Sequence, residues 1–226
     1  MNSNELKQQV AEKALDWVKD KSVIGLGTGS TARYFIQGLR EKIQKENLDV
    51  TTVTSSFGSA QLAQELGIPM VSFESVASID VYVDGADEVD PDNNLIKGQG
   101  AAMVQEKILA AASKSFIVIV DDSKLVSHLC EKFPVPVEVI PMAWSKVWRT
   151  LESLGATLSI RQAVGKDGPI ITDQGNLIID STFPATANFA KLDTEINNIP
   201  GVLGHGIFLN MATKIIVGSD SGIKLI

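Results

Sequence analysis

Apolar and polar positions along the chain alternate in two distinct patterns. Leu6, Val10, Ala14 and Val18 recur at three- and four-residue spacing, which predicts an amphipathic opening helix. The run Val23–Leu26 is short, apolar and followed by glycines, which predicts a buried strand. The same patterns then predict helices at 32–44, 59–66 and 101–112 and strands at 50–54, 81–83 and 116–120. Strands and helices that alternate in this way indicate a mostly parallel sheet covered on both faces.

The pattern changes near residue 130. Prolines within 135–141 predict an edge or boundary strand, because proline cannot donate to a sheet ladder. A helix at 143–154, strands at 157–160 and 177–180, a helix at 189–198 and a strand after Gly201 complete a β-α-β-β-α-β order, which is ferredoxin-like. The apolar strand 214–217 is expected to return to the first sheet.

These elements predict an α/β protein with a Rossmann-like, mostly parallel sheet domain and a smaller ferredoxin-like α+β lobe. The expected domain boundaries are 1–130 with 207–226 for the first domain, which would bind substrate and carry catalysis. The lobe is expected at 131–206 and is expected to make oligomer contacts.

Composition narrows the possible partners. The 226 residues are 44% hydrophobic, and 20 basic against 27 acidic residues give a net charge of −7. Such a balance argues against nucleic acid as the main partner, although a small phosphorylated ligand needs only a local cluster of donors. A single cysteine, no apolar leader at the start and no membrane-length apolar run lead us to expect a cytoplasmic protein without membrane contact.

Polar clusters follow the expected parallel strands. They are Gly25–Thr31, Ser55–Ser56, Asp84–Glu88 and Asp121–Lys124. Ligands of open parallel sheets bind at the carboxyl ends of the strands, so we expect these clusters to meet there.

The glycine-rich cluster has two interpretations. Gly27, Gly29 and Ala32 fit the spacing of a dinucleotide fingerprint, but the second strand lacks an acidic residue at its end for the ribose, and no Walker lysine follows. Backbone amides and the hydroxyls of Thr28 and Ser30 before a helix suit a single phosphate. A tight turn with hydroxyl caps would look the same.

The acidic run Asp84, Asp87, Glu88, Asp90 and Asp92 has three interpretations: metal ligands, acceptors for sugar hydroxyls, or a solvated loop. Its spacing does not fit an EF-hand.

Lys97 and Lys124 could offer positive charge to a phosphate or an oxyanion. Glu106 has small and apolar neighbours on its expected helix, which would bury its carboxylate and favour a general base. An ordinary surface glutamate is the alternative.

Five segments taken together resemble one known family. They are GLGTGST (25–31), DGADE (84–88), KGQGAAMVQEKI (97–108), DDSK (121–124) and FPVPVEVIP (133–141), and their order and spacing resemble ribose-5-phosphate isomerase, type A. The resemblance implies interconversion of ribose 5-phosphate and ribulose 5-phosphate in the pentose phosphate pathway, without metal or organic cofactor, by a homodimer or homotetramer.

The resemblance also implies roles for individual residues. Glu106 would be the general base of a cis-enediolate mechanism, with Lys97 stabilising the oxyanion and Asp84 and Asp87 assisting ring opening or proton transfer. Residues implied to bind substrate are Thr28, Gly29, Ser30, Thr31, Asp84, Gly85, Ala86, Asp87, Lys97, Gly98, Gln99, Gly100 and Lys124.

Two positions depart from the family pattern. Gln99 replaces a common glycine, and the second strand is followed by Ser-Ser-Phe-Gly-Ser where the family often has a serine and a threonine a few residues apart. A non-catalytic sugar-phosphate sensor of the same fold is the alternative function. The chain retains Glu106 and shows no helix-turn-helix, which favours catalysis.

Overall fold

A computed structural model describes residues 3–226. The chain forms two compact units. Unit 1 contains the described residues up to Ala86 together with Gln105–Leu125 and Asn210–Ile226; unit 2 contains Asp87–Val104 and Val126–Leu209. The domain boundaries expected from the sequence stay a prediction. They differ from the compact units mainly at Asp87–Val104, whose short strands pair within unit 2.

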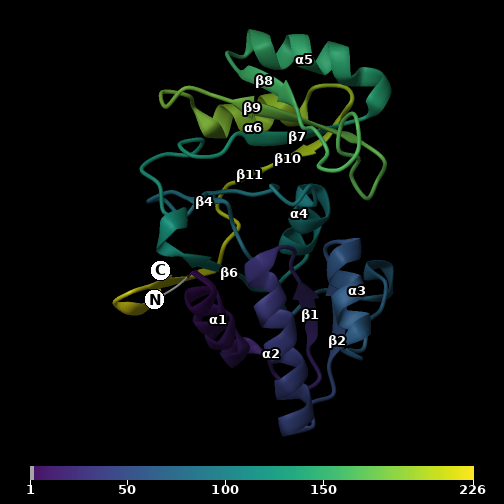
Figure 1. The fold of residues 1–226 in the computed structure, drawn as a ribbon, viewed down its shortest axis with the longest axis vertical. Coiled ribbons are helices and arrows are strands. Elements are labelled where there is room, and N and C mark those ends of the chain that lie inside the picture. The colour runs from purple at the N-terminus through teal and green to yellow at the C-terminus, as the bar shows by residue number, and fades with distance from the viewer. Residues whose placement is uncertain (1–2) are drawn as a thin grey trace. The chain divides into compact units, whose positions relative to one another are not determined.

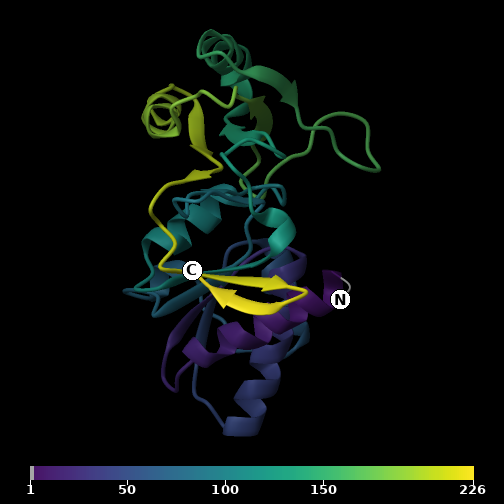
Figure 2. The same ribbon diagram turned by 90° about the vertical axis from the view of Figure 1, so that its left-hand side faces the viewer.

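Unit 1 is built on a six-stranded sheet (Figure 1). In spatial order its strands are β13 (Gly222–Leu225), β12 (Lys214–Ser219), β6 (Phe116–Asp121), β3 (Val81–Asp84), β1 (Val23–Leu26) and β2 (Thr51–Thr54). All neighbours are parallel except β12 and β13, the yellow hairpin beside the C label in Figure 2. The expected mostly parallel sheet and the return of the strand after residue 213 are therefore confirmed.

Three helices cover one face of this sheet. They are α1 (Ser3–Ala14), α2 (Ser30–Glu46) and α3 (Phe57–Glu65). The apolar residues of α2 recur every three or four positions and pack with Val81 and Val83 of β3. Because side chains alternate along a strand, Tyr82 and Asp84 lie on the opposite face. The boundary between the units falls within helix α4 (Met103–Ala111), which belongs to unit 1 from Gln105 onward.

Unit 2 contains a four-stranded antiparallel sheet. In spatial order its strands are β10 (Val202–His205), β7 (Val135–Val139), β9 (Leu177–Thr182) and β8 (Thr157–Ile160). Helices α5 (Trp144–Ser153) and α6 (Phe189–Asn197) share its apolar core. The order β7-α5-β8-β9-α6-β10 along the chain confirms the ferredoxin-like lobe. A second, three-stranded sheet joins β11 (Ile207–Phe208), β5 (Leu95–Ile96) and β4 (Glu88–Val89).

Of the two alternatives expected for 135–141, an edge strand or a boundary strand, the edge strand is wrong. Strand β7 pairs with β9 on one side and with β10 on the other, so it is central. Proline is accommodated because Pro136 lies one residue beyond the last β7–β10 pair, Val137 with His205. On that side the Pro136 carbonyl accepts from the Gly206 N–H (2.8 Å), and the ladder needs no donor from residue 136.

Four short 3-10 helices complete the described elements: η1 (Leu15–Trp17), η2 (Phe73–Ser75), η3 (Asp122–Lys124) and η4 (Pro141–Ala143). Across residues 3–226 no helix is both long and apolar enough to span a membrane.

Candidate active site

The polar clusters of unit 1 meet at one edge of its sheet. Strands β6, β3, β1 and β2 are neighbours and parallel, so their carboxyl ends lie side by side. Asp84 is the last residue of β3, and the segments that follow β6, β1 and β2 carry Lys124, Thr28 and Ser55 respectively. The expectation that these clusters come together is confirmed.

Two glycines of β1 and its loop make room for side chains of β3. A Cβ on Gly25 would lie 2.6 Å from Cδ2 of Tyr82, closer than real Cβ atoms come to neighbouring atoms. A Cβ on Gly27 would overlap the Asp84 carboxylate. Both glycines therefore serve the packing of Tyr82 and Asp84. In this loop Gly29 is the residue with a positive φ (108°), a conformation that favours glycine.

Asp84 is fully buried and connects β3 by a hydrogen bond to the loop that follows β1. Its Oδ1 accepts from the backbone N–H groups of Thr28 (2.9 Å) and Gly85 (2.7 Å), and its Oδ2 accepts from the Tyr82 hydroxyl. The carboxylate thus fixes where the loop after β1 begins.

Tyr82 interacts with both Asp84 and Glu106. Its ring stacks on Phe116 with centroids 5.0 Å apart. Burial raises the pKa of Tyr82 well above its usual value, and the charges of Asp84 and Glu106 raise it further. Glu106 lies in the first turn of α4 with 3% of its surface exposed, so the expectation of a buried carboxylate is confirmed. Two buried acids therefore act electrostatically on the same phenol.

The loop from Gly27 to Thr31 is fixed on its other side by hydroxyl groups. Thr28 Oγ1 lies 2.8 Å from the Oγ atoms of both Ser55 and Ser56, and Ser59 Oγ donates to the Gly27 carbonyl (2.5 Å). The departure from the family pattern after β2 thus provides a serine cluster that holds Thr28.

Helix α2 begins at Ser30, directly after this loop, and the first amides of a helix have no acceptor within the helix. A cavity of about 390 Å³ beside the loop is lined in part by Thr28, Ser30 and Arg33. Backbone amides, hydroxyls and one guanidinium are groups that bind an anion.

Lys124 is half-buried at the end of η3, after β6. Asp121 caps this turn by accepting from the Ser123 N–H (3.0 Å). The turn places a lysine at the same sheet edge as Thr28 and Asp84.

The remaining candidates belong to unit 2. Lys97 follows β5 and is buried, with its N–H donating to the Gly206 carbonyl (2.9 Å) and its Nζ 5.7 Å from the centre of the Phe208 ring. Asp87 Oδ2 accepts from the Gln99 N–H (3.0 Å). Gln99 is not among the described residues with positive φ, so the replacement of glycine at this position introduces no backbone strain.

The acidic run is divided among separate local structures. Glu88 is buried and accepts from the N–H groups of Cys130 (2.6 Å), Lys132 and Phe133 (2.8 Å). Asp90 Oδ1 accepts from the N–H groups of Asp92 (3.0 Å) and Asn94 (2.8 Å). Within residues 3–226 no group of three or more His, Cys, Asp or Glu is arranged to hold a metal ion. Glu88 and Asp90 act as anchors of loops.

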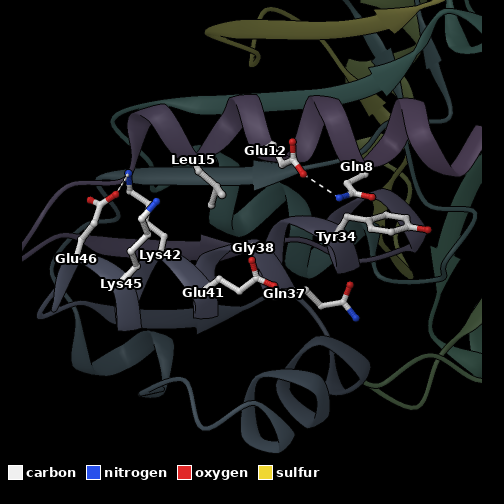
Figure 3. Close-up of a pocket in the computed structure, with 10 residues that line it drawn as sticks. All are labelled: Gln8, Glu12, Leu15, Tyr34, Gln37, Gly38, Glu41, Lys42, Lys45 and Glu46. Carbon is white, nitrogen blue, oxygen red and sulfur yellow. Dashed lines mark hydrogen bonds and ion pairs between the residues drawn. The ribbon is translucent and has the colours of Figure 1, made fainter. Parts of the chain in front are cut away.

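A second groove lies elsewhere in unit 1. It measures about 420 Å³ and runs between α1 and α2 (Figure 3). Side chains at its wall pair with each other, Gln8 with Glu12 (2.8 Å) and Lys42 with Glu46 (3.2 Å). None of the ten lining residues belongs to the candidate set, so the chemistry predicted from the sequence lies outside this groove.

Sequence reasoning missed two residues of interest. Tyr82 could have been found, because residues two apart in a strand share a face and Asp84 was already a candidate. Arg161 contacts the loop after Lys97 from more than sixty residues away, and no local pattern marks that contact.

Known proteins match this chain over nearly its full length. The profile of the family described as ribose 5-phosphate isomerase A (phosphoriboisomerase A) matches residues 51–222. A protein of Pyrococcus abyssi named ribose-5-phosphate isomerase A is 49% identical over 225 residues, covering 99% of this chain and 98% of that protein.

Solved structures agree. Ribose 5-phosphate isomerase A from Methanocaldococcus jannaschii superposes with a TM-score of 0.95 at 46% identity and covers 100% of this chain and 99% of that one. A D-ribose-5-phosphate isomerase in complex with phospho-erythronic acid gives a TM-score of 0.97 at 48% identity, with 100% and 99% covered. With the profile, the sequence relatives and the full-length structural matches in agreement, the chain belongs to the ribose-5-phosphate isomerase A family.

Proposed function

We propose that this chain interconverts D-ribose 5-phosphate and D-ribulose 5-phosphate, a step of the non-oxidative pentose phosphate pathway, with Glu106 as the general base. The observation that carries the proposal is the burial of Glu106, whose charge acts on the buried Tyr82, in a chain of this family. Burial keeps bulk water away from the Glu106 carboxylate, which suits a group that must accept a proton from carbon and return it.

The reaction moves one proton between two carbons and needs no oxidant. In the open-chain aldose, Glu106 removes the proton from C2, the electron pair of that C–H bond forms the C1–C2 double bond, and the π electrons of the C1 carbonyl move onto O1 to give a cis-enediolate. Glu106 then returns the proton to C1, the hydroxyl proton on O2 is transferred to O1, and the electron pair left on O2 forms the C2 ketone. A positioned base of this kind contributes about 10²–10⁴-fold to the rate.

Other residues bind and orient the sugar phosphate in this proposal. The amides and hydroxyls of Thr28, Gly29, Ser30 and Thr31 hold the anionic end, because they surround the first turn of α2. Asp84, Gly85, Ala86 and Asp87 contact sugar hydroxyls, and Asp84 also keeps the loop in place. Lys97 stabilises the negative oxygen of the enediolate, and Gly98, Gln99, Gly100 and Lys124 complete the binding set on the basis of the resemblance.

The complex of a relative with phospho-erythronic acid supports a site for a short phosphorylated chain. The carboxylate of such an acid is planar and negatively charged, as the C1–C2 end of an enediolate is. We also expect a homodimer or homotetramer, which light scattering of the purified protein would test.

The test is ketose formation from ribose 5-phosphate by the purified protein, with and without EDTA. We expect turnover that EDTA does not reduce, and competitive inhibition by phospho-erythronate. Absence of turnover would overturn the proposal. If ribose 5-phosphate still raised the melting temperature in that case, the protein would be a sensor of sugar phosphates.

A further inference from the structure

We propose that Arg161 is a positioning residue that sets the orientation of the peptide groups between Gly98 and Gly100, so that amide N–H groups face the substrate and carbonyl oxygens face away. This inference rests on the proposed function, because it concerns the loop that would bind the sugar phosphate.

Arg161 directly follows β8 and reaches two consecutive carbonyls. Its Nη1 donates to the carbonyl oxygen of Gly98 (2.7 Å) and to that of Gln99 (3.1 Å). One nitrogen can contact both oxygens only if the two peptide groups turn the same way. The guanidinium therefore determines the conformation of this loop.

Asp180 of β9 holds the guanidinium in place. Its Oδ2 accepts from Nε (2.9 Å) and its Oδ1 accepts from Nη2, which is the two-point geometry of a strong arginine–carboxylate pair. The side chains are only 11% and 15% exposed, so water competes little for either charge. The backbone N–H of Arg161 also donates to Ile178 O (3.0 Å) on the strand that carries Asp180.

Peptide geometry then fixes where the N–H groups point. In a trans peptide the C=O and the N–H point in opposite directions. The Gly98 carbonyl faces Arg161, and the N–H of Gln99 in the same peptide group donates to Asp87 on the other side (3.0 Å). The Gln99 carbonyl also faces Arg161, so the N–H of Gly100 points to the side of Asp87. Asp87 and Gly100 both belong to the proposed binding set.

The surrounding loop leaves little freedom for another arrangement. Gly98 has φ +108°, and a Cβ there would lie 2.7 Å from Cγ of Pro136 and 2.9 Å from Cβ of Met103. The Ala101 N–H closes the turn on the Gly98 carbonyl (3.0 Å). If the two peptide groups flipped, the Gln99 N–H would lose its bond to Asp87, and two partially negative oxygens would face the substrate side and repel an anionic substrate.

Arg161→Lys is the main test, because lysine keeps a positive charge but cannot contact both carbonyls and both Asp180 oxygens together. We expect KM for ribose 5-phosphate and Ki for phospho-erythronate each to rise about tenfold or more, since both report binding. The melting temperature should fall by only about 2–4 °C. Hydrogen exchange at the Gln99 and Gly100 amides should accelerate, while exchange in β9 stays as in the parent protein.

Two further variants complete the test. Asp180→Asn loses the charge that orients Arg161 and should reproduce the same changes more weakly; it also replaces Arg161→Lys if that variant does not fold. Arg149→Lys changes an exposed arginine of α5 in the same unit and should alter none of these quantities.

Unchanged KM, Ki and amide exchange in both Arg161→Lys and Asp180→Asn would overturn the proposal. So would a drop in melting temperature with KM and Ki within about twofold of the parent values, which would mark a purely structural ion pair. If the parent protein itself lacks turnover, the proposed function fails, and amide exchange still decides the positioning role.

Discussion

Gly27 occupies a position where any side chain would collide with the carboxylate of Asp84. Asp84 ends β3 and Gly27 directly follows the neighbouring parallel strand β1, and the Gly27 N–H donates to the Val83 carbonyl (2.9 Å), so neither backbone can move away without breaking the sheet edge. The absence of a side chain at Gly27 therefore allows a fully buried acid to lie behind the loop.

Gly27→Ala is expected to destabilise the protein by about 1–3 kcal/mol, the usual cost of overpacking a filled interior. Catalysis should fall as well, because displacement of Asp84 releases the Thr28 amide. Urea unfolding and a turnover assay would measure the two effects. Gly58→Ala is the matched stability control: its Cβ would meet nothing closer than Ser56 Oγ at 3.9 Å, so this variant should be at least as stable as the parent. Parent-like stability and turnover in Gly27→Ala would contradict the assignment.

Glu106→Gln keeps the shape of the side chain and removes its ability to accept a proton. We expect kcat to fall by about 10²–10⁴-fold with KM changed little, the range that general bases provide. Glu41→Gln, on the exposed surface of α2, serves as the control and should retain full activity. Near-normal kcat in Glu106→Gln would show that Glu106 is not the general base.

Tyr82 should stay protonated in strongly alkaline solution. Its pKa is raised well above the usual value by burial and by the charges of Asp84 and Glu106. Native parent protein and Tyr82→Phe should therefore give the same tyrosinate absorbance as the pH is raised through about 10, where an ordinary tyrosine titrates. In urea, where both proteins are unfolded, the parent should show one more titrating tyrosine than Tyr82→Phe.

Because the pKa of Tyr82 is raised by folding, the stability of the folded protein should depend on pH in the alkaline range. Because the folded pKa lies above the unfolded one, the contribution of Tyr82 is complete below about pH 10 and declines as the pH rises through and beyond the unfolded value. A tyrosinate step of Tyr82 in the native protein near pH 10 would contradict this account.

Asp80 should contribute to stability only when it is ionised. Lys114 donates to its Oδ1 (2.7 Å) and the Val23 N–H to its Oδ2 (2.8 Å), and the hydrogen bond from Lys114 is the main cause that lowers the pKa of Asp80. A lowered folded pKa gives stability that is present above the unfolded value of about 4 and is lost as the pH falls through the folded value.

Asp80→Asn should therefore lower the melting temperature at pH 7, and the difference from the parent should shrink between about pH 5 and pH 2. Asp16→Asn removes an exposed partner of Lys13 and should change little at any of these pH values. A difference for Asp80→Asn that stays constant across this range would contradict the assignment of the stabilising charge.

Much of the fold follows from sequence because its signals are local. The runs that became β1 and β6 are apolar and bounded by polar residues, and the helix that became α2 repeats its apolar positions every three or four residues. The meeting of Thr28, Asp84 and Lys124 at one edge follows from the parallel order alone.

The features that escaped prediction depend on distant pairing. Strands β4, β5 and β11 have two residues each, too few for any periodicity to show. Pro136 indicated an edge because sequence cannot reveal that the neighbouring strand β10 ends its pairing at Val137. Glu88 looked like a candidate ligand, and only the fold brings the amides of residues 130–133 to its carboxylate.

The position of β12 in the sheet determines when this sheet can be completed as the chain is synthesised. Strand β6 is buried along its whole length and pairs with β12, which the ribosome makes only after all of unit 2. Until then β6 is left as an apolar strand edge, the kind of surface that recruits other chains. A nascent chain halted before residue 214 should therefore bind chaperones or aggregate, and release of the last strand should end that vulnerability.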